Sequence, residues 1–511
     1  MRRPLHPSTG VLACVRSAAV FGIEASIVHV EVDVALGLPG FQMVGLPDAS
    51  VRESRDRVRS AIRNSGFEFP IRRVTVNLAP ADIRKAGSAF DLPIALGVLA
   101  AGGLIERSSF DDTLIVGELS LDGGIQSARG VLPVAAAARR YGYKGLLLPH
   151  PNGAEAAVVS GLHLFPVRSL TESVSALQDP SRFLSSAPPL PPAPHQHATF
   201  DGDFADVHGQ ALARRALEIA AAGGHNALMI GPPGAGKTMM ARRVATILPP
   251  LTFDEALEAT AIHSVAGLLP LGTRLLCERP FRAPHHTISD VALVGGGQVP
   301  RPGEISLAHH GVLFLDEMPE FSRQVLEVLR QPVEEGCVRI ARAARTVCFP
   351  ARFMLVGAMN PCPCGFLGDP TRTCRCTSMQ VAKYAARLSG PLRDRLDLTV
   401  PVAAVPPREL QDPSPGESSA DIRLRVTAAR ALQMGRGQRL NARLQGRALR
   451  GSVSLDGDAR KLLAKALARF SLSARGYDRV LRVARTIADL ECADRVGHTH
   501  LAEALQYRGD V

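Results

Sequence analysis

The chain has 511 residues, 46% of them hydrophobic, so we expect two to four domains with complete apolar cores. Its formal net charge of +11 favours an acidic partner such as nucleic acid, but only six of the 59 basic residues are lysine, so a single arginine is weak evidence. No apolar run approaches the ~20 residues that span a bilayer, and Arg16 interrupts the run Val11–Val15 too early for a signal peptide, which argues against a membrane protein and predicts a cytoplasmic one.

Strand and helix patterns alternate through the N-terminal region. Ser26–Val34 alternates apolar and polar residues, as a half-buried strand does, and Ala49–Ser65 is charged and amphipathic, as a surface helix is. The further predicted elements are strand Arg73–Leu78, helix Asp91–Ala101, strand Thr113–Glu118, helix Val131–Tyr141 and strand Gly145–Pro149. The pattern predicts a mixed α/β domain.

A proline-rich seam follows this domain. Residues 185–194 read Ser-Ser-Ala-Pro-Pro-Leu-Pro-Pro-Ala-Pro, a composition that offers no helix or ladder hydrogen bonding and behaves as a semi-rigid spacer. We therefore predict an N-terminal domain (1–178), a linker (179–203), a second domain core (204–402) and a C-terminal helical lid (403–511).

A glycine-rich octet lies between a predicted strand and a predicted helix of the second domain. The apolar run Ala227–Ile230 enters it, and helical periodicity begins at Gly236. The pattern G-x-x-x-x-G-K-[ST] in this context is typical of a P-loop, whose backbone N–H groups surround phosphates, whose lysine reaches the outer phosphates and whose hydroxyl binds Mg²⁺. The predicted ATP-binding residues are Gly231, Pro232, Pro233, Gly234, Ala235, Gly236, Lys237 and Thr238, with Thr238 also a Mg²⁺ ligand.

A second apolar strand, Val312–Leu315, ends in the carboxylates Asp316 and Glu317. We expect Asp316 to support Mg²⁺ and Glu317 to orient and deprotonate an attacking water. A third strand, Phe353–Ala358, is followed by Asn360, which is well placed to sense the γ-phosphate beside that water. With the P-loop, these residues predict an enzyme that hydrolyses ATP.

The C-terminal segment shows helical periodicity with few strand signals. The predicted helices are Ala420–Met434, Leu455–Arg469, Arg475–Leu490 and His500–Arg508. With the ATP site and this helical lid, residues 204–511 resemble an AAA+ ATPase. The fold class expected is therefore α/β, a P-loop AAA+ module with a C-terminal helical lid.

The AAA+ resemblance implies two catalytic arginines. An arginine finger reaches the nucleotide of the neighbouring subunit; Arg395 matches its position best, and Arg393 is the nearby competitor. A lid arginine, sensor 2, contacts the γ-phosphate; Arg475 matches it, and Arg482 is a weaker candidate. A finger supplied in trans completes the transition-state charge only in an assembled ring. The resemblance therefore implies a homo-oligomer, by family a hexamer.

A basic hairpin is predicted over residues 336–350, after a helix at Ser322–Gln331. Its arginines are Arg339, Arg342 and Arg345. The placement resembles the pre-sensor hairpin of the AAA+ branch that contains magnesium chelatase and the replicative MCM helicases, where such hairpins point into the pore. The resemblance implies sequence-independent contacts with DNA phosphates. A solvated basic hairpin is the alternative.

Four of the nine cysteines form two close pairs, Cys362 with Cys364 and Cys374 with Cys376. Four thiolates in this arrangement could hold a structural Zn²⁺ in tetrahedral geometry. Because the spacing is C-x-C rather than the commoner C-x₂-C, a small loop of reduced cysteines is the alternative.

Motifs of the N-terminal domain narrow the resemblance further. They are Val44-Gly-Leu-Pro, Val76-Asn-Leu-Ala-Pro-Ala-Asp, Gly87-Ser-Ala-Phe-Asp-Leu-Pro and Gly117-Glu-Leu-Ser-Leu-Asp-Gly-Gly. They resemble a Lon-protease-like domain (ribosomal protein S5 domain 2-like), which the ComM/YifB family joins to a magnesium-chelatase-type AAA+ module. With Pro361-Cys-Pro-Cys-Gly and Ser389-Gly-Pro, the resemblance covers almost the whole chain.

Lon proteases use a serine and a lysine as nucleophile and base. Alignment with their motifs places Ala89 at the nucleophile, with Ser88 one position off, and Leu132 at the lysine. A slip of one residue would restore the serine but not the lysine. We therefore expect the domain to be proteolytically inactive, with a structural or DNA-guiding role.

The resemblance implies an ATP-driven, ring-forming DNA motor, a helicase that promotes branch migration during recombination and natural transformation. Its cofactors would be ATP and Mg²⁺, with Zn²⁺ as a further candidate, and its partners other copies of the chain and single-stranded or branched DNA. The rival is a metal-chelatase-type remodelling ATPase that acts on a protein partner. A third hypothesis is an ATP-dependent protease, which would require the serine–lysine dyad that is missing.

Overall fold

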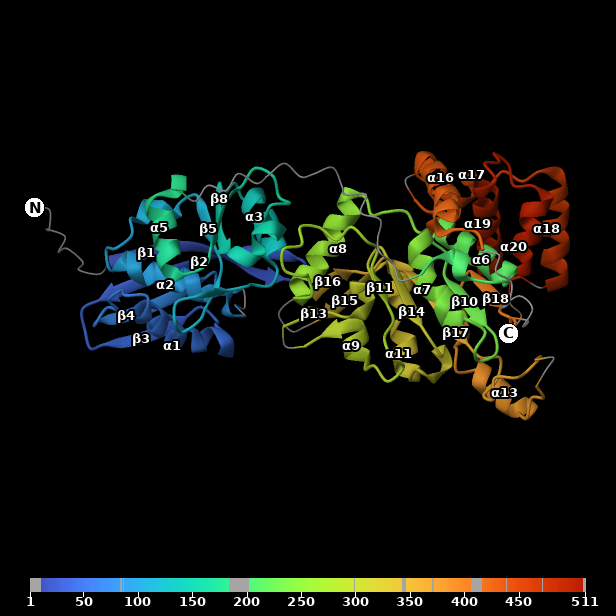
Figure 1. Cartoon of the computed structure of the whole chain (residues 1–511), viewed down its shortest axis with the longest axis horizontal. Helices are drawn as coiled ribbons and strands as arrows, with labels where there is room; N and C mark the ends of the chain where they lie inside the picture. The colour runs from blue at the N-terminus through green and yellow to red at the C-terminus, as the bar shows by residue number, and fades with distance from the viewer. Residues whose placement is uncertain are drawn as a thin grey trace, which may run out of the picture.

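The computed structural model describes residues 11–82, 85, 87–182, 202–297, 299–341, 346–369, 372–405, 416–437, 439–470 and 472–508. The molecule is elongated, with the N-terminal domain at one end and the helical C-terminal region at the other (Figure 1). The P-loop domain lies between them. The predicted linker and the arginines Arg342 and Arg345 fall largely or wholly outside the described residues.

A seven-stranded sheet, ordered β3-β4-β2-β1-β5-β8-β9, forms the N-terminal domain. Helices α1, α2 and α5 share a core with one face, and α3 and α4 pack on the other. All eleven residues of α2 are buried, and all but Asp91 are apolar, so the helix lies between α1 and the β1–β2 hairpin. The bounds are β1 Val11–Phe21, β2 Glu24–Ala35, β3 Gly40–Val44, α1 Ala49–Asn64, β4 Arg73–Ala79, α2 Asp91–Ala101, β5 Thr113–Ile115, β6 Glu118–Leu119, β7 Ile125–Gln126, α3 Val131–Arg140, β8 Gly145–Pro149, α4 Gly153–Ala156, β9 His163–Val167 and α5 Leu170–Gln178.

Strand β1 was not among the predicted elements, although it supplies eleven residues of the central hairpin. Alternate residues Ala13, Val15 and Ser17 are buried, so the strand pattern is present. Arg16, which interrupts the apolar run, lies on the opposite face and pairs across the hairpin with His29. The charge marks the outward face of a strand and not the end of an apolar segment.

Two predicted elements are each split in the structure. The strand predicted at Thr113–Glu118 divides at Gly117, whose N–H donates to Ala89 and whose carbonyl accepts from Leu92, so the chain leaves the main sheet there. The helix predicted at Ser322–Gln331 divides at Leu329, one turn before Pro332, which has no N–H to continue the helical ladder.

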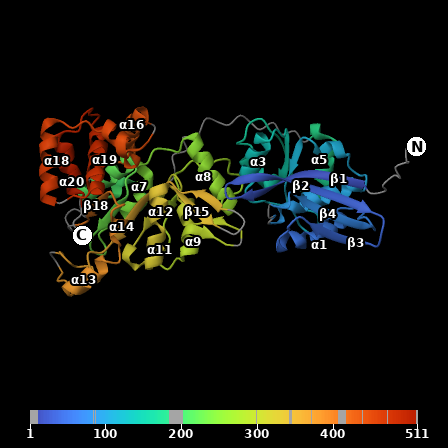
Figure 2. The ribbon, with the colours of Figure 1, turned by 180° about the vertical axis from the view of Figure 1, so that it is seen from behind.

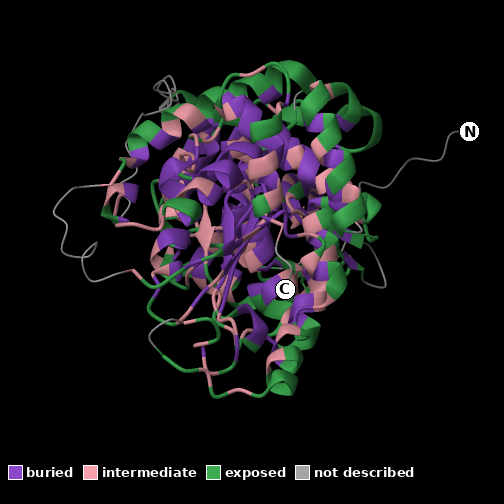
Figure 3. Ribbon diagram, turned by 90° about the vertical axis from the view of Figure 1, so that its right-hand side faces the viewer, coloured by how far each residue is buried: buried purple, intermediate pink, exposed green. Residues whose placement is uncertain are grey.

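A parallel five-stranded sheet, ordered β11-β14-β17-β10-β18, forms the second domain. Its middle strands are buried and enclosed by helices with exposed outer surfaces (Figure 3), as parallel strands covered on both faces require. The bounds are α6 Ala211–Gly223, β10 Ala227–Ile230, α7 Lys237–Ile247, α8 Phe253–Ala266, β11 Phe281–Arg282, α9 Asp290–Val294, β12 Gly295–Gly296, β13 Arg301–Pro302, α10 Glu304–Leu307, β14 Val312–Leu315, α11 Arg323–Val328, α12 Arg330–Glu335, β15 Cys337–Ala341, β16 Thr346–Pro350, β17 Met354–Met359, α13 Ser378–Ala385, α14 Gly390–Arg393 and β18 Leu398–Pro401.

The C-terminal region is helical and shares a core with α6 and α7. Its longest buried stripe belongs to α19, which packs against α6, α16 and α20. No described helix combines the length and the apolar character that a bilayer-spanning segment needs. The bounds are α16 Ser419–Gly437, α17 Gly446–Ser452, α18 Gly457–Phe470, α19 Ala474–Leu490 and α20 His498–Gln506.

The N-terminal domain contacts the second domain at two places. The turn between β1 and β2 packs Phe21 and Ile23 against the core beneath the β15–β16 hairpin. On α8, Ser264 accepts from the N–H of Gly130 at 3.2 Å and donates its hydroxyl to the buried carboxylate of Glu155. Both views of the ribbon place these elements at the junction (Figures 1 and 2). The hairpin therefore cannot shift far without disturbing the N-terminal domain.

Gly22→Ala tests this contact. Gly22 has a φ of +66°, and a Cβ there would lie 2.8 Å from Val347 Cγ1 on the hairpin. Gly66 has a φ of +82° with open space around it, so Gly66→Ala carries a similar backbone strain of about 1–2 kcal/mol without the clash. We expect both variants to lower the unfolding temperature, but only Gly22→Ala to increase protease cleavage between the domains. Equal cleavage of the two variants would contradict the contact.

Candidate functional site

The P-loop joins β10 to α7 at the carboxyl end of the parallel sheet. Gly234 and Gly236 have φ near +80°, a conformation that glycine adopts without steric cost. At Gly231 a Cβ would lie 2.0 Å from the carbonyl oxygen of Val402, so this position also admits no side chain. The loop geometry thus explains the glycines of the motif.

Lys237 begins α7 and is 8% exposed. Its ammonium donates to the carbonyls of Gly231 (2.6 Å) and Pro232 (2.8 Å) and to Asn360 Oδ1 (3.1 Å). Burial lowers the pKa of Lys237, while the charges of Asp316 and Glu317 raise it. Two of the predicted site residues, Lys237 and Asn360, are therefore in direct contact although they are far apart in sequence.

The predicted Mg²⁺ ligands are also brought together. The Thr238 hydroxyl donates to Asp316 Oδ2 at 2.6 Å, and Asp316 Oδ1 accepts from the N–H of Glu317 at 3.0 Å. Because β14 and β10 both flank β17 in parallel, their carboxyl ends meet at one edge of the sheet. A hydroxyl beside a carboxylate suits Mg²⁺, which takes few protein oxygens and keeps several waters.

Glu317 has the left-handed backbone conformation (φ +48°) and a side chain that is 56% exposed. It lies beside the predicted Mg²⁺ ligand Asp316, where its carboxylate can meet water. His286 Nδ1 lies 4.0 Å from Glu317 Oε2, and the His286 ring lies edge-on to Phe321. Reasoning from the sequence missed His286, since its only signal is a histidine pair in a turn-rich segment.

Arg395 lies on the opposite edge of the sheet from the P-loop of its own chain. It precedes β18, whose first residue pairs with Ala227 at the start of β10, and its carbonyl accepts from Asn226 Nδ2 at 2.9 Å. Four residues of β10 separate that edge from the loop, about 13 Å of extended chain. Arg395 contacts Glu334, donates to Pro391 O, and has a buried Nε with no hydrogen-bond partner. Such an arginine faces away from the nucleotide of its own subunit.

The lid arginines lie on that same edge. Arg479 donates to Leu396 O at 2.9 Å, and Arg475 is exposed one helical turn earlier on the same face of α19. Arg482, the weaker sensor candidate, donates to Ala442 O and lies 3.6 Å from Asp397, so it joins the lid to the sheet. Arg482 is therefore held by contacts within its own chain, whereas Arg475 is exposed.

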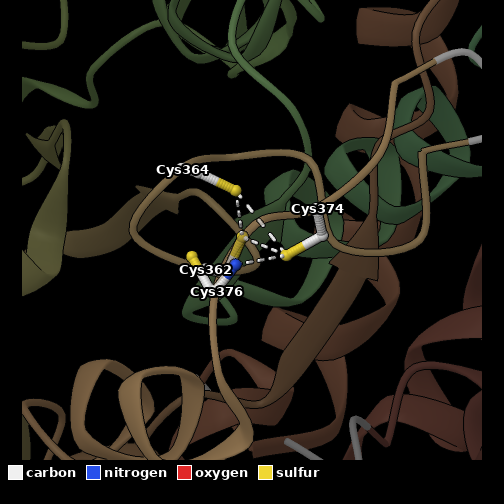
Figure 4. A group of neighbouring side chains, drawn as sticks. All are labelled: Cys362, Cys364, Cys374 and Cys376. Carbon is white, nitrogen blue, oxygen red and sulfur yellow. Dashed lines mark hydrogen bonds between the residues drawn. The ribbon is translucent and has the colours of Figure 1, made fainter.

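The four cysteines predicted as zinc ligands converge next to the P-loop (Figure 4). Their sulfurs lie within 4.8 Å of one another, and the separations among Cys362, Cys364 and Cys374 are 3.3, 3.6 and 3.7 Å. A tetrahedral Zn²⁺ with Zn–S bonds of ~2.3 Å requires S–S separations of about 3.8 Å. Backbone N–H donors at Phe366 and Arg375 lower the pKa of the Cys364 thiol to about 6, while burial and the neighbouring cysteines raise the pKa of Cys374 and that of Cys376, so the thiolate is favoured at Cys364. The residues therefore fit a tetrahedral zinc ion.

The cysteine loop also contacts the ATP site. A Cβ on Gly365 would lie 2.7 Å from Pro233 of the P-loop and 3.9 Å from Asn360 Cγ. Cys362 is buried and lies two residues after Asn360. Changes in the cysteine cluster would therefore reach both the phosphate loop and the sensor asparagine.

The predicted basic hairpin is present as β15 and β16. Val338, Ile340, Val347 and Phe349 point into the core, which places alternate residues outward. Arg339 is 59% exposed and pairs with Glu335 at 3.6 Å. The structure thus describes one of the three predicted DNA-contacting arginines.

In the N-terminal domain, Ser88 is the serine that the alignment leaves one position from the nucleophile. The Ser88 hydroxyl donates to Glu118, and the buried ammonium of Lys85 donates to Pro80 O. Leu132 is buried where the Lon lysine would stand. That the domain is proteolytically inactive stays a prediction.

Sequence comparisons identify the family. Residues 203–410 match "Magnesium chelatase, subunit ChlI", residues 30–152 match "Subunit ChlI of Mg-chelatase", and residues 416–508 match "Magnesium chelatase, subunit ChlI C-terminal". The chain is 44% identical over 510 residues to "Competence protein ComM" of Haemophilus influenzae, which covers 98% of each chain. It is 45% identical over 505 residues to YifB of Salmonella typhimurium, which covers 97% of each chain.

The chain belongs to the ComM/YifB family. A more distant relative, "Magnesium-chelatase subunit ChlI" of Euglena gracilis, is 24% identical over 156 residues, which are 26% of this chain and 44% of that one. The family places a magnesium-chelatase-type AAA+ module in the chain, and this module implies an ATPase. The parallel sheet and the helical C-terminal region are those expected for this module.

Proposed function

We propose that the protein is a ring-forming ATPase that moves DNA, acting as a helicase that promotes branch migration in recombination and natural transformation. The observation that carries the ATPase part is the convergence of Lys237, Thr238, Asp316 and Asn360 at one sheet edge, with Glu317 exposed beside them. The DNA part is supported by near-full-length similarity to a protein named for competence, and by the net charge of +11.

In this proposal the P-loop residues 231–238 bind the ATP phosphates, and Thr238 and Asp316 hold Mg²⁺. Mg²⁺ would neutralise charge on the transferred phosphoryl group. Glu317 accepts the proton of the attacking water, and Asn360 holds Lys237 in position. The proposed division is an N-terminal domain (1–178), a linker (179–203), an ATPase core (204–402) and a helical lid (403–511).

The neighbouring subunit supplies the remaining charge. Arg395 and Arg475 both lie on the sheet edge opposite the P-loop of their own chain, so we assign both to the nucleotide of the adjacent subunit. Arg395 is 15% exposed and paired with Glu334, so it would exchange that carboxylate for the phosphates of the neighbour, and hydrolysis would depend on assembly. We propose a homo-hexamer on this basis and on the AAA+ resemblance.

The hairpin would meet DNA. Arg339, with Arg342 and Arg345 beyond the described residues, would bind phosphates without reading bases. The β15–β16 hairpin follows directly after α12 and leads through β16 and Phe353 into the strand that ends at Asn360. A displacement of Asn360 at the γ-phosphate can therefore be transmitted to the hairpin through β17.

The test is ATPase activity of the full chain with and without DNA, followed by branch migration on a four-way junction. We expect several-fold stimulation of ATP turnover by single-stranded or branched DNA. Stimulation by a protein partner and by no form of DNA would favour the rival, a chelatase-type remodelling ATPase, which the chelatase family matches support.

We also propose that the cysteine cluster holds a structural Zn²⁺. The purified protein is then expected to contain about one zinc per chain by elemental analysis, and Cys374→Ser to lose it and to lower ATPase activity several-fold through Pro233 and Asn360. Cys492→Ser, at an exposed cysteine outside the cluster, is the matched control. Full activity without zinc would instead support a loop of reduced cysteines.

A further inference from the structure

A row of arginines runs along the outer side of α1 in the N-terminal domain. Arg52, Arg59 and Arg63 are all exposed. At 100° per residue their directions fall within about 40° of one another, and they cover about 16 Å of helix. This length is comparable to a few successive phosphates of a nucleic-acid strand.

Among the ion pairs of the described residues, none joins any of these three arginines to a carboxylate. Other arginines of α1 are paired: Arg55 pairs with Asp56 at 3.1 Å, and Arg57 makes a two-pronged contact with the buried Asp91 at 2.7 and 3.1 Å. Arg57 joins α1 to the buried Asp91, whereas the Arg55–Asp56 pair is exposed and places Asp56 between Arg52 and Arg59 along the helix. Arg52, Arg59 and Arg63 form an unpaired row that faces outward.

The apolar face of α1 is not available to a lipid or a helical partner. Val51, Val58, Ala61 and Ile62 are fully buried in the domain core. A helix that binds a membrane surface needs its apolar face free to enter the lipid. The outward side carries the exposed Arg52, Arg55, Arg59 and Arg63 against the exposed Glu53 and Asp56, and this net positive charge suits phosphate groups.

Two further exposed arginines follow α1 in the sequence. The Arg59 guanidinium lies 5.8 Å from the centre of the Phe69 ring, which steadies it by a cation–π contact. The segment that carries Phe69 leads to Arg72 and Arg73, both exposed, with Glu68 as the exposed acidic residue nearby in sequence. Arg73 also donates to Gln42 at 3.1 Å.

The arginine row is held at a fixed position relative to the second domain. The β1–β2 turn and α8 hold the N-terminal domain against the second domain, and the turn contacts the hairpin itself. In both opposite views α1 lies along the same edge of the molecule as α9 and α11 (Figures 1 and 2). DNA bound by α1 would be held at a set distance from the hairpin.

We propose that Arg52, Arg59 and Arg63 form a second DNA-binding surface that grips the phosphate backbone outside the hairpins. The proposal rests on the DNA motor function proposed above, and it assigns DNA binding to the protease-like domain. Six copies of the row in a ring would add sequence-independent affinity at a set distance from the hairpins.

The experiment uses the full-length chain with the three arginines changed to serine (R52S/R59S/R63S). Affinity for a fluorescent single-stranded and a double-stranded oligonucleotide is measured by anisotropy at several salt concentrations. We expect at least tenfold weaker binding and a log–log salt slope smaller by about 2 to 3, since each phosphate contact contributes about 0.7 to 0.9. Basal ATPase activity without DNA is expected to be unchanged, which also verifies folding.

Two matched variants control for charge and for side-chain removal. R447S/R450S/R460S removes the same charge from exposed arginines of α17 and α18, and is expected to retain the salt slope. R52K/R59K/R63K keeps the charge and is expected to retain most of the affinity. Equal loss in the lid variant would indicate a general charge effect and would overturn the proposal.

The outcomes separate this inference from the proposed function. Unchanged binding by R52S/R59S/R63S, in a chain that binds DNA, overturns the second surface and leaves the motor intact. Wild-type protein that binds no DNA at any salt concentration overturns the motor and the surface together. Salt-dependent binding of the wild type to anionic lipid vesicles, and not to DNA, would overturn the assigned partner.

Discussion

Arg395→Ala is expected to lower the turnover of ATP by about 10³-fold while leaving ATP binding unchanged, because an arginine finger typically contributes 10³–10⁵ to the hydrolysis rate. Arg395 lies on the sheet edge away from its own P-loop, so its removal leaves that loop and its metal-binding residues in place. Steady-state ATPase assays and equilibrium binding of a fluorescent ATP analogue measure the two quantities. Arg393→Ala is the matched control, and we expect it to change turnover less than tenfold.

Mixing two inactive variants gives a sharper test of action in trans. Arg395→Ala has an intact Glu317 but no finger, and Glu317→Gln has an intact finger but no base. In randomly mixed rings at equal amounts, a working site needs the first variant beside the second, so up to about a quarter of wild-type activity should return. A mixture as inactive as its components would show that Arg395 serves its own subunit or no subunit.

Glu317→Gln is expected to bind ATP with nearly wild-type affinity and to hydrolyse it 10²–10⁴ times more slowly, the contribution typical of a positioned general base. The amide keeps the size of the carboxylate but cannot accept the proton of the attacking water. Turnover and nucleotide affinity are measured separately, as above. Glu320→Gln is the control, since Glu320 is a nearby carboxylate that pairs with Arg387 at 2.8 Å.

Lys237→Ala completes the comparison, since it should abolish nucleotide binding itself. The lysine sits at the centre of the loop, in contact with Gly231, Pro232 and Asn360. Together the variants divide the site into binding by Lys237 and chemistry by Glu317. Wild-type turnover by the Glu317→Gln protein would move the role of base to another residue.

Local patterns predicted the elements that carry the ATP site. Ala227–Ile230 and Asp91–Ala101 have the same bounds in the sequence prediction and in the structure. Val312–Leu315 is likewise a buried strand. These runs succeed because, apart from Asp91, they are apolar throughout, and a glycine or a charged residue follows each of them. The sequence prediction omitted strand β1 because Arg16 was taken as the end of an apolar run and not as a residue on the other face of an alternating strand.

Other features depend on partners that are distant in sequence. Nothing near Arg395 in the chain indicates that it faces away from its own nucleotide; the parallel pairing of β18 with β10 decides this. His286 reaches Glu317 only because β11 pairs beside β14. Gly365 meets Pro233 because the cysteine loop folds back from the end of β17.

The sequence by itself determined the family, the phosphate loop, the two carboxylates and the cysteine pairs, since each depends on residue types at short spacing, which act through local backbone geometry and ligand chemistry. The tertiary structure decided which of these groups meet, where the arginines of the lid and of β18 point, and how the N-terminal domain contacts the hairpin. Those relations depend on strand order and side-chain packing between distant segments, which no local spacing encodes.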